Sequence, residues 1–243
     1  PLVHRATAQW FISMESHGLR TKSLKAIDET TFYPSKAKER IKSMIETRPD
    51  WCVSRQRVWG VPLPIFLSKK DGKPLVDNDV FENIATIFEN EGSDCWFSDD
   101  PQKFLGTKYK AEDYEKISDI VEVWFDSGST HSYVLEKRDD LKWPASMYLE
   151  GSDQHRGWFH SSLLESCGTR GKAPFESILS HGFVVDGKGH KMSKSMGNVI
   201  APEDILKKYG ADILRIWVSS SNYAEDLRID YSILDQHAES YRK

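Results

Sequence analysis

Between Ile120 and Val185 the chain alternates short apolar segments with polar, glycine-containing loops, and this order constrains the fold more than any other feature. The predicted segments are strands at 120–125, 147–150 and 178–185, loops at 126–129, 151–154 and 186–189, and a helix at 156–167. Strands that alternate with helices are typical of a doubly wound, mostly parallel α/β sheet. Because such sheets bind ligands at the carboxyl ends of their strands, we expect the three loops to share one rim.

The loop that follows the last of these strands carries two lysines. Lys191 and Lys194 lie three residues apart, among serines and directly after the glycine-rich turn 186–189. Two ammonium groups on one mobile loop suit a polyphosphate, because attack on phosphorus spreads negative charge over the equatorial oxygens and a leaving pyrophosphate. An ordinary solvated basic loop fits the same residues, and the pattern alone does not choose between the two interpretations.

Further elements are predicted on both sides of this unit. They are a bent strand over 1–17 that ends at His17-Gly18, helices at 19–29 and 35–47, a lysine- and acid-rich insertion at 68–118 with a helix at 79–90, helices at 202–209 and 211–219, and the start of a third helix within 220–243. Pro202 and two carboxylates fit a first helical turn, and Gly210 fits its stop.

An extended segment over 51–66 carries a pair of arginines. Arg55 and Arg57 are two residues apart, so in a strand their side chains point to the same face, beside Trp51 and Trp59. Two guanidinium groups next to aromatic rings suit a phosphate or a stacked base. Salt bridges at a domain boundary explain the arginines equally well.

Composition narrows the function classes. The 243 residues carry a net charge of −4, which argues against binding nucleic acid through bulk charge, and the longest apolar runs are too short to span a membrane. The three cysteines are far apart and form no Cys-x-x-Cys pair, so we expect neither a disulfide framework nor a zinc site. This use of cysteine fits a reducing compartment, and we expect a cytoplasmic location. The chain begins at Pro1 without an initiator Met, and we expect it to be part of a longer protein.

With these segments in place, the chain resembles the class I aminoacyl-tRNA synthetases, and among them the isoleucyl branch. The segment Lys191–Ser195 reads Lys-Met-Ser-Lys-Ser, the second signature of that class. Four further blocks agree in order: Trp51–Gly60, Trp124–Thr130, Glu150–Phe159 and His181–Phe183. Valyl and leucyl relatives share the Ser-Arg-Gln block and the lysine loop, but the residues of the Trp124 and Glu150 blocks resemble those of the isoleucyl branch.

The resemblance implies a fold and a division of the chain. The fold is the second half of a doubly wound, Rossmann-like nucleotide-binding sheet, with an inserted α+β subdomain and a helical C-terminal extension. The implied parts are 1–50, the exit of an upstream editing insertion with junction helices; 51–67 and 119–200, half of the catalytic domain; 68–118, the inserted subdomain; and 201–243, a helical connector toward an anticodon-binding domain.

The resemblance also implies an activity: ATP, with Mg²⁺, activates isoleucine to an adenylate, which is then transferred to tRNA(Ile). Lys191 and Lys194 are the implied catalytic residues. The implied ATP and adenylate contacts are Glu150, Gly151, Asp153, His181, Met192 and Lys194. Glu150, Gln154, Trp124 and Trp158 are implied to bind the amino acid, and Arg55 and Arg57 are possible tRNA contacts. No metal ligand is implied, and the longer protein is expected to be monomeric and to avoid membranes.

Plainer roles remain open for several of these residues. Spacing alone favours core positions for Trp124 and Trp158, His181 fits a structural histidine nearly as well, and Glu150 fits a solvated strand-edge carboxylate. A stand-alone module that binds a nucleotide or RNA without chemistry, and a valyl-type enzyme, remain alternative functions.

One departure from the family bears on catalysis. The family's first signature, His-Ile-Gly-His or a close variant, has no counterpart, because no His-x-Gly-His sequence occurs in these residues. We therefore expect these residues alone to have little or no adenylating activity, and no editing activity.

Overall fold

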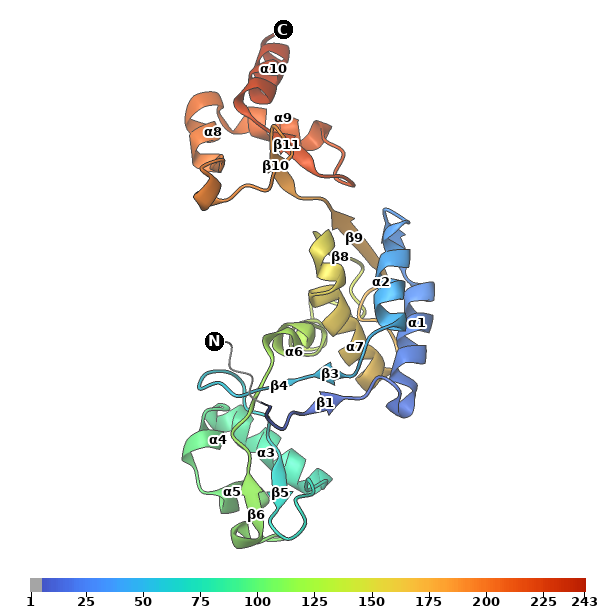
Figure 1. Ribbon diagram of the computed structural model, residues 1–243, viewed down its shortest axis with the longest axis vertical. Coiled ribbons are helices and arrows are strands. Elements are labelled where there is room, and N and C mark those ends of the chain that lie inside the picture. The colour runs from blue at the N-terminus through green and yellow to red at the C-terminus, as the bar shows by residue number, and fades with distance from the viewer. Residues whose placement is uncertain (1–5) are drawn as a thin grey trace.

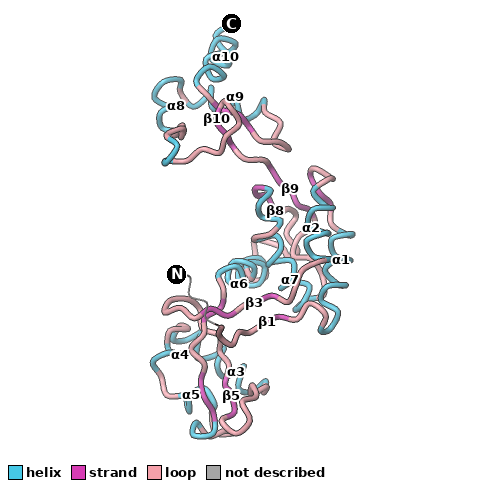
Figure 2. Tube along the Cα trace, viewed as in Figure 1, coloured by secondary structure: helices cyan, strands magenta, loops and turns pink. Residues whose placement is uncertain are grey.

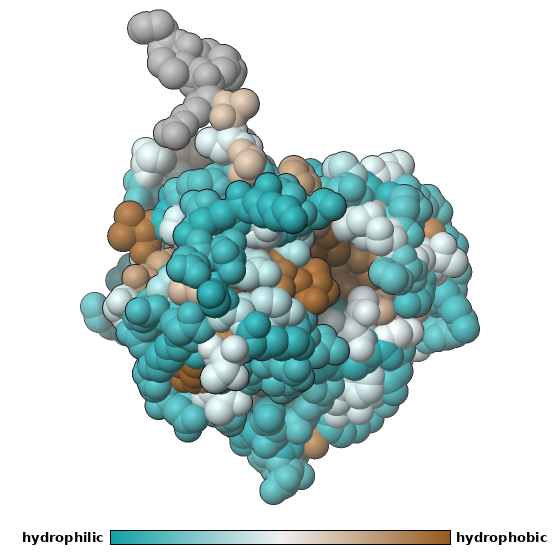
Figure 3. All heavy atoms as spheres, turned by 90° about the horizontal axis from the view of Figure 1, so that it is seen from below, coloured by the Kyte–Doolittle hydropathy of each residue, from teal (hydrophilic) through white to brown (hydrophobic). Residues whose placement is uncertain are grey.

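The computed structural model describes residues 6–243 and shows an elongated molecule with three hydrophobic cores (Figure 1). An inserted lobe lies at one end, a central lobe holds the parallel sheet, and a C-terminal lobe lies at the other end. Helices take up more of the chain than the short strands do, as the view coloured by secondary structure shows (Figure 2). Seen from the inserted-lobe end, the surface is mostly hydrophilic, with small hydrophobic patches (Figure 3).

A three-stranded parallel sheet organises the central lobe. Its order is β2 (Thr31–Tyr33), β9 (Ser177–His181) and β8 (Tyr148–Gly151). The helices α1 (Leu19–Glu29), α2 (Ala37–Glu46) and α7 (Trp158–Arg170) pack on the same core as this sheet. This mixed α/β architecture with a parallel sheet confirms the predicted fold class. The helices expected at 19–29, 35–47 and 156–167 are present, whereas the edge strand β2 was not predicted.

Short antiparallel pairs connect the central lobe to the insertion. The strand β1 (Phe11–Ile12) pairs with β3 (Trp51–Cys52), and β4 (Ser54–Arg55) pairs with β7 (Ile120–Val121). Of residues 6–17, the described part of the strand expected over 1–17, only Phe11 and Ile12 are therefore in a ladder. A turn at Ser16–Gly18 ends it as predicted, and the part of that prediction at residues 1–5 lies outside the described residues.

The strand expected at 120–125 is wrong beyond Val121. Its partner β4 is two residues long, and after a last bond from the Glu122 N–H to the Val53 carbonyl the chain turns into the helix α6 (Val123–Gly128). A π-helical turn, His131–Leu135, follows. The loop at 126–129 therefore belongs to α6 and its end. It does not lie at a strand's carboxyl end in the parallel sheet, which corrects the expectation of three loops on one strand-end rim.

The inserted lobe has its own core, as expected for an α+β subdomain. The strands β5 (Phe66–Ser68) and β6 (Tyr114–Lys116) form an antiparallel pair. The helices are α3 (Asn78–Glu91), α4 (Cys95–Ser98) and α5 (Pro101–Leu105), with a 3₁₀ turn at Ala111–Asp113. Phe66, Trp96 and Phe104 are almost completely buried between them. The predicted helix is α3, but α4 and α5 occupy a stretch that was expected to be loop.

The C-terminal lobe begins after β9 and contains the lysine loop. The strand β10 (Val184–Asp186) pairs in parallel with β11 (Leu227–Ile229). A 3₁₀ turn at Lys194–Met196 and the helices α8 (Pro202–Tyr209), α9 (Ala211–Ser220) and α10 (Tyr231–Arg242) complete the lobe. The helices α8 and α9 agree with the predictions.

The single strand expected at 178–185 is two strands in different sheets. They are separated by Gly182 and Phe183. A Cβ at Gly182 would lie 2.2 Å from the Glu225 carbonyl oxygen, so the absence of a side chain lets the two backbones touch where the chain leaves the central sheet. This close contact marks the boundary between the central and C-terminal lobes.

Candidate active site

The carboxyl ends of β8 and β9 bring several predicted residues together. Gly151 is in register with His181, and Glu150 with Ser180. A Cβ at Gly151 would lie 2.7 Å from Asp153 Oδ1, so a side chain here would displace that carboxylate. Glu150 and Asp153 are exposed, and neither forms an ion pair among the described residues. Two free carboxylates at a glycine-containing strand end can accept hydrogen bonds from hydroxyl or ammonium groups.

Gln154 orients the turn between β8 and α7. Its Nε2 donates to Asp153 Oδ2 at 3.1 Å, and its Oε1 accepts the backbone N–H of Trp158 at 2.8 Å. The second bond satisfies one of the amide groups that an α-helix leaves unpaired at its start. The side chain is therefore held in place, with one oxygen lone pair still available for a substrate group.

Two tryptophans lie beside Gln154. Trp158 stacks on Tyr148 with ring centroids 4.0 Å apart and an interplanar angle of 4°, and its Nε1 donates to the Ser127 carbonyl at 3.0 Å. A Cβ at Gly157 would lie 3.0 Å from Trp124 Cη2 and 2.3 Å from Gln154 Oε1, so Trp124 and Gln154 both border this glycine. Trp124 is 42% exposed, which argues against a core position for it, whereas Trp158 packs on the central core.

His181 lies beside Gly151 on the neighbouring strand, and a Cβ at Gly151 would be 3.7 Å from His181 Cε1. Its Nδ1 lies 2.8 Å from the Gly182 carbonyl, and the half-buried ring lines a cavity of about 320 Å³. Lys36, which precedes α2, Arg40 of α2 and the buried His155 line the same cavity. Burial, with a smaller effect from Arg40, lowers the pKa of His155 to about 4, so its ring is neutral at pH 7. The sequence did not single out Lys36 or Arg40, because helical basic residues carry no signal that distinguishes them from a solvated face.

The lysine loop is a hairpin in the C-terminal lobe. The Asp186 N–H donates to the His190 carbonyl at 2.9 Å, and Val185 bridges to Lys191. Lys191 and Lys194 are exposed and form no ion pair with any described residue. Met192 packs partly against the C-terminal core, so its side chain faces that core in this structure. The hairpin therefore presents two uncompensated ammonium groups.

Asp186 and Asn198 hold this hairpin together. The carboxylate of Asp186 accepts the Asn198 Nδ2–H and the backbone N–H groups of His190 and Lys188, in that order of effect, and these bonds lower its pKa to about 2. Asn198 also accepts the Ser193 N–H at 2.9 Å and donates to the Lys191 carbonyl. Sequence analysis did not single out these two residues, because a network of this kind is visible only once the hairpin is formed.

The structure does not join the lysines to the acidic strand end. Among the described residues, no hydrogen bond or ion pair links Lys191 or Lys194 to the segment 150–154. The two groups belong to different lobes, connected through the chain between β9 and β10 (Figure 1). The predicted site is therefore assembled in two parts, and only the part at β8, β9 and α7 is in contact.

The arginine pair has divided roles. Arg55 Nη2 lies 3.1 Å from the buried Glu122 carboxylate, which also accepts the Trp51 Nε1–H at 2.7 Å. Trp51 is buried, and it does not line the cavity beside Arg57 and Trp59. Arg57 and Trp59 are exposed and line, with Arg55, a cavity of about 350 Å³. The salt-bridge interpretation therefore applies to Arg55. Arg57 forms no ion pair within residues 6–243, so of the two arginines it is the one available to a phosphate or a base.

One cluster in the inserted lobe has the composition of a metal site. Glu91, Cys95 and Asp99 offer ligand atoms within 4.8 Å of one another. Lys103 bridges the two carboxylates, with its Nζ 2.7 Å from Asp99 Oδ2. Burial also raises the pKa of the Cys95 thiol, which disfavours the thiolate that a metal needs. The lysine already supplies the positive charge that this cluster requires.

Within residues 6–243, no helix combines the length and the apolar character that a membrane crossing needs.

Comparison with known proteins adds a family and relatives. A family model described as tRNA synthetases class I (I, L, M and V) matches residues 3–230. The isoleucine–tRNA ligase of Pelagibacter ubique is 84% identical over 243 residues, which are all of this chain and 27% of that protein. That of Syntrophotalea carbinolica is 55% identical over 249 aligned residues, again 27% of its length. The chain thus spans about a quarter of the length of these relatives.

Solved structures share the fold at lower sequence identity. A LeuRS from Agrobacterium radiobacter, in a ternary complex with tRNA and LeuAMS, superposes with a TM-score of 0.55 at 22% identity and covers 86% of this chain and 30% of that one. A Mycobacterium tuberculosis methionyl-tRNA synthetase in complex with methionyl-adenylate gives a TM-score of 0.59 at 17% identity and covers 91% of this chain and 36% of that one. These similarities concern the fold.

Proposed function

The chain belongs to the class I tRNA synthetases for I, L, M and V, and on that premise we propose that it forms part of an isoleucine–tRNA ligase. The observation that carries this proposal is the strand end at which Gly151 and His181 are in register, with Gln154, Trp124 and Trp158 beside it. The residues that the family resemblance implies for adenylate and amino-acid binding are neighbours there, which supports the proposal. The 84% identity to an isoleucine–tRNA ligase selects isoleucine among the four amino acids of the family.

In the proposed first step, a carboxylate oxygen of isoleucine attacks the α-phosphorus of ATP, which enters as its Mg²⁺ complex. A new carboxyl–phosphorus bond forms, the bond from the α-phosphorus to the bridging oxygen breaks, and pyrophosphate leaves with that electron pair. Lys194, assisted by Lys191, stabilises the charge that builds up on the phosphates, because a compact ammonium group is worth most where negative charge develops. Met192 lies in the chain between the two lysines.

The strand end binds the rest of the adenylate. Asp153 accepts the ribose hydroxyls, Gly151 leaves room for the nucleotide, and His181 contacts it from the neighbouring strand. Glu150 and Gln154 accept hydrogen bonds from the substrate ammonium group. Trp124 and Trp158 enclose the isoleucine side chain, since rigid aromatic rings give an apolar pocket a defined shape.

The position of the lysine loop adds a condition to this mechanism. The hairpin forms no contact with the segment 150–154 here, so the C-terminal lobe must approach the strand ends for the lysines to act. Closure of a charged loop over bound phosphates is a common way to complete an active site only once substrate is present. Lys191 and Lys194 are free of carboxylate partners among the described residues, so no ion pair there opposes such a movement.

The second step transfers isoleucine to the 3′ end of tRNA(Ile) and releases AMP. Arg57, which is exposed beside Trp59, is the better candidate of the two arginines for a tRNA contact, because Arg55 is engaged with Glu122. We further propose a monomeric, cytoplasmic protein without membrane contacts. These residues alone are proposed to lack adenylation activity, since no His-x-Gly-His sequence occurs in them.

ATP–pyrophosphate exchange with the full-length protein tests the proposal. We expect isoleucine to support exchange far better than valine, and Lys194→Ala to lower kcat by roughly 10²- to 10³-fold, the usual effect of removing one charge-stabilising group. Lys207→Ala, which removes an exposed lysine from α8 in the same lobe, is the matched control and should keep full activity. Preferential activation of valine, or an active Lys194→Ala variant, would contradict the assignment.

A further inference from the structure

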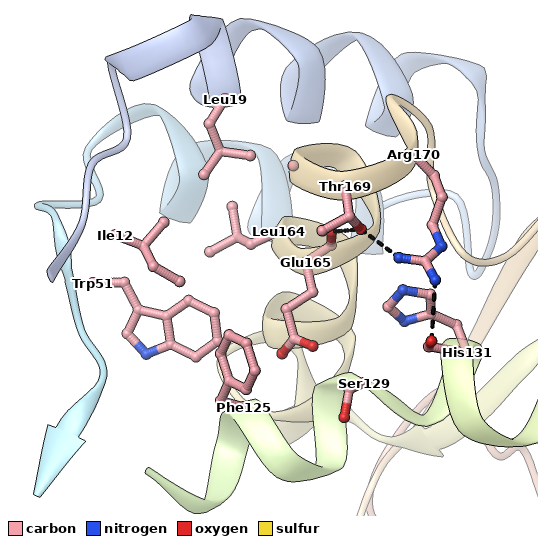
Figure 4. Close-up of a pocket in the computed structure, with 12 residues that line it drawn as sticks. Ile12, Leu19, Trp51, Phe125, Ser129, His131, Leu164, Glu165, Thr169 and Arg170 are labelled. Carbon is pink, nitrogen blue, oxygen red and sulfur yellow. Dashed lines mark hydrogen bonds between the residues drawn. The ribbon is translucent and has the colours of Figure 1, made fainter. Parts of the chain in front are cut away.

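A cavity of about 420 Å³ lies between α7 and α6, apart from the proposed active site (Figure 4). Its wall is mainly apolar and comes from segments that are distant in the sequence: Ile12, Leu19, Trp51, Phe125 and Leu164. A volume of this size, an apolar lining and a few convergent polar groups are the usual properties of sites for small organic molecules.

Two buried polar side chains in this cavity have unpaired atoms. Glu165, only 8% exposed, extends from α7 toward Phe125 and Ser129 (Figure 4), and its Oε1 has no hydrogen-bond partner in the described chain. The imidazole of His131 binds the Gly128 carbonyl through Nδ1 at 3.0 Å, whereas its Nε2 is unpaired within residues 6–243. Buried polar atoms in native proteins nearly always have a partner, so such a pair in one cavity points to a ligand.

Gly128 is adapted to this carboxyl group. A Cβ at Gly128 would lie 2.1 Å from Glu165 Oε1 and 2.9 Å from Ser161 Oγ. Any side chain at position 128 would therefore push Glu165 out of its place. The close approach keeps the carboxyl group at the wall of the cavity.

The charges around Glu165 favour a cation. Burial, then Asp126 and then Glu122, raise the pKa of Glu165 to about 9, which favours a neutral carboxyl group at pH 7. Arg170 is the nearby cation, but its guanidinium group is bound in a fork by Glu136 at 2.7 Å. Burial lowers the pKa of His131, which disfavours its charged form. Arg55 pairs with Glu122, and the guanidinium group of Arg48, 5.5 Å from the centroid of the Trp51 ring, also interacts electrostatically with Glu122. Within the described residues, neither arginine forms an ion pair with Glu165 or Asp126.

We propose that this cavity binds a small primary amine, with the ammonium group on Glu165 and an apolar body against Trp51, Phe125 and Leu164. A carboxylate on Glu165 would be repelled by the Asp126 and Glu122 charges that also act on Glu165, and an alcohol would offer a hydrogen bond without charge. On binding, the ammonium group takes the place of the proton on Glu165, and that proton is released to solvent. The apolar body excludes water from the new ion pair, which strengthens it.

Calorimetric titration of the full-length protein tests the proposal, with 2-phenylethylamine as the probe and 2-phenylethanol and 3-phenylpropanoate as matched compounds. A saturating isoleucyl-adenylate analogue keeps the probes out of the proposed active site, so the outcome is independent of the proposed function. At pH 8 we expect the amine to bind at least tenfold more tightly than the alcohol. We expect no binding of the acid, and proton release detected as a dependence of the heat on the buffer.

Three variants make the test specific. Glu165→Gln should lower amine affinity to that of the alcohol, and Ser129→Leu, which fills the cavity, should abolish binding of both. Glu89→Gln changes an exposed glutamate of the inserted lobe and should have no effect. Equal affinity of amine and alcohol, an unchanged Glu165→Gln variant, or no saturable binding because another segment fills the cavity would overturn the proposal. If Glu165→Gln does not fold, a crystal structure with the amine decides: its nitrogen must lie within hydrogen-bond distance of Glu165.

Discussion

Asn198 Nδ2 donates a hydrogen bond to Asp186 Oδ2 at 2.9 Å and so joins the residue that ends β10 to the residue that follows the lysine loop. The same asparagine accepts the Ser193 N–H, between the two lysines. The hairpin therefore has a defined shape although the ammonium groups of Lys191 and Lys194 bind nothing within the described residues. Its geometry depends on two side chains that do not belong to the lysine motif.

The first prediction concerns this asparagine. Asn198→Ala in the full-length protein removes three hydrogen bonds, so we expect the loop to become more mobile and kcat of ATP–pyrophosphate exchange to fall by about tenfold, equivalent to about 1.4 kcal/mol. The KM for isoleucine should not change, because the amino-acid pocket lies in the other lobe. Faster amide exchange at Ser193 separates a loop effect from misfolding. Asn78→Ala, an exposed asparagine of α3, is the control.

A second prediction compares two glycines. Gly182→Ala places a methyl group 2.2 Å from the Glu225 carbonyl oxygen and 2.6 Å from the Asp226 nitrogen, and backbone atoms cannot move aside as a flexible side chain can. We expect a loss of about 1–3 kcal/mol in the free energy of unfolding, measured by urea denaturation, as for other overpacked sites.

Gly168→Ala provides the contrast to this variant. Its added Cβ would meet only Leu19 Cδ1, at 3.7 Å, and it lies within α7. Alanine is preferred over glycine in helices by about 1 kcal/mol, so this variant should be neutral or more stable. Equal stability of the two variants would show that the close contact at Gly182 does not constrain the lobes.

The third prediction separates the two arginines. Arg55→Ala leaves the buried Glu122 carboxylate with one partner fewer, so we expect it to lower the free energy of unfolding by about 1–3 kcal/mol. Arg57→Ala removes an exposed side chain with no ion pair among the described residues, and it should leave stability unchanged. In the full-length protein it should reduce kcat/KM for tRNA while isoleucine-dependent exchange stays intact. A stability loss from Arg57→Ala with normal tRNA charging would reverse this assignment of roles.

The fourth prediction is a pH dependence that originates at Glu165. Its pKa is about 9 in the folded chain, against an ordinary value of 4.5 once the chain is unfolded, so between these limits the folded state holds a proton that the unfolded state releases. The resulting stabilisation is complete below pH 4.5 and is lost as the pH rises toward 9. The slope is at most about 1.4 kcal/mol per pH unit.

Urea denaturation at pH 6, 7, 8 and 9 measures this effect as the difference between the wild type and Glu165→Gln. The variant, which cannot titrate at this position, should lose stability more slowly as the pH rises. Glu89→Gln should follow the wild type at every pH. Parallel curves for the wild type and Glu165→Gln would mean that the buried carboxyl group does not retain its proton in the folded chain.

Local signals in the sequence were sufficient for most of the helices. Asp77 caps α3 by accepting the Asp79 N–H at 2.9 Å, and Pro202 and Gly210 bound α8, so these elements are fixed by residues within or next to them. Strand predictions were less accurate. Whether Ile120–Phe125 continues as a strand depends on the length of its partner β4, which lies far back in the sequence at Ser54–Arg55.

The candidate site shows the same division. Glu150, Gly151 and Asp153 lie at a strand's carboxyl end, because a short apolar run followed by a glycine predicts that position. Three-dimensional contacts were not predictable: the stacking of Trp158 on Tyr148, the bond from Asn198 to Asp186, and the placement of the lysine loop in a separate lobe. Each depends on how distant segments pack, and single-sequence patterns carry no information on that.

The close backbone contact at Gly182 limits how the lysine loop can move relative to the central sheet. Gly182 donates to the Tyr223 carbonyl, Phe183 to Asp226, and Leu227 to the Phe183 carbonyl, so the chain that leaves the central sheet is fastened to the strand that leads into α10. A Cβ at Gly187, in the hairpin itself, would lie 2.0 Å from Asp230 Oδ2, the side chain that caps α10. The lysine hairpin and the terminal helix α10 are therefore packed directly against each other. A movement of α10 as a rigid body would therefore carry Lys191 and Lys194 with it.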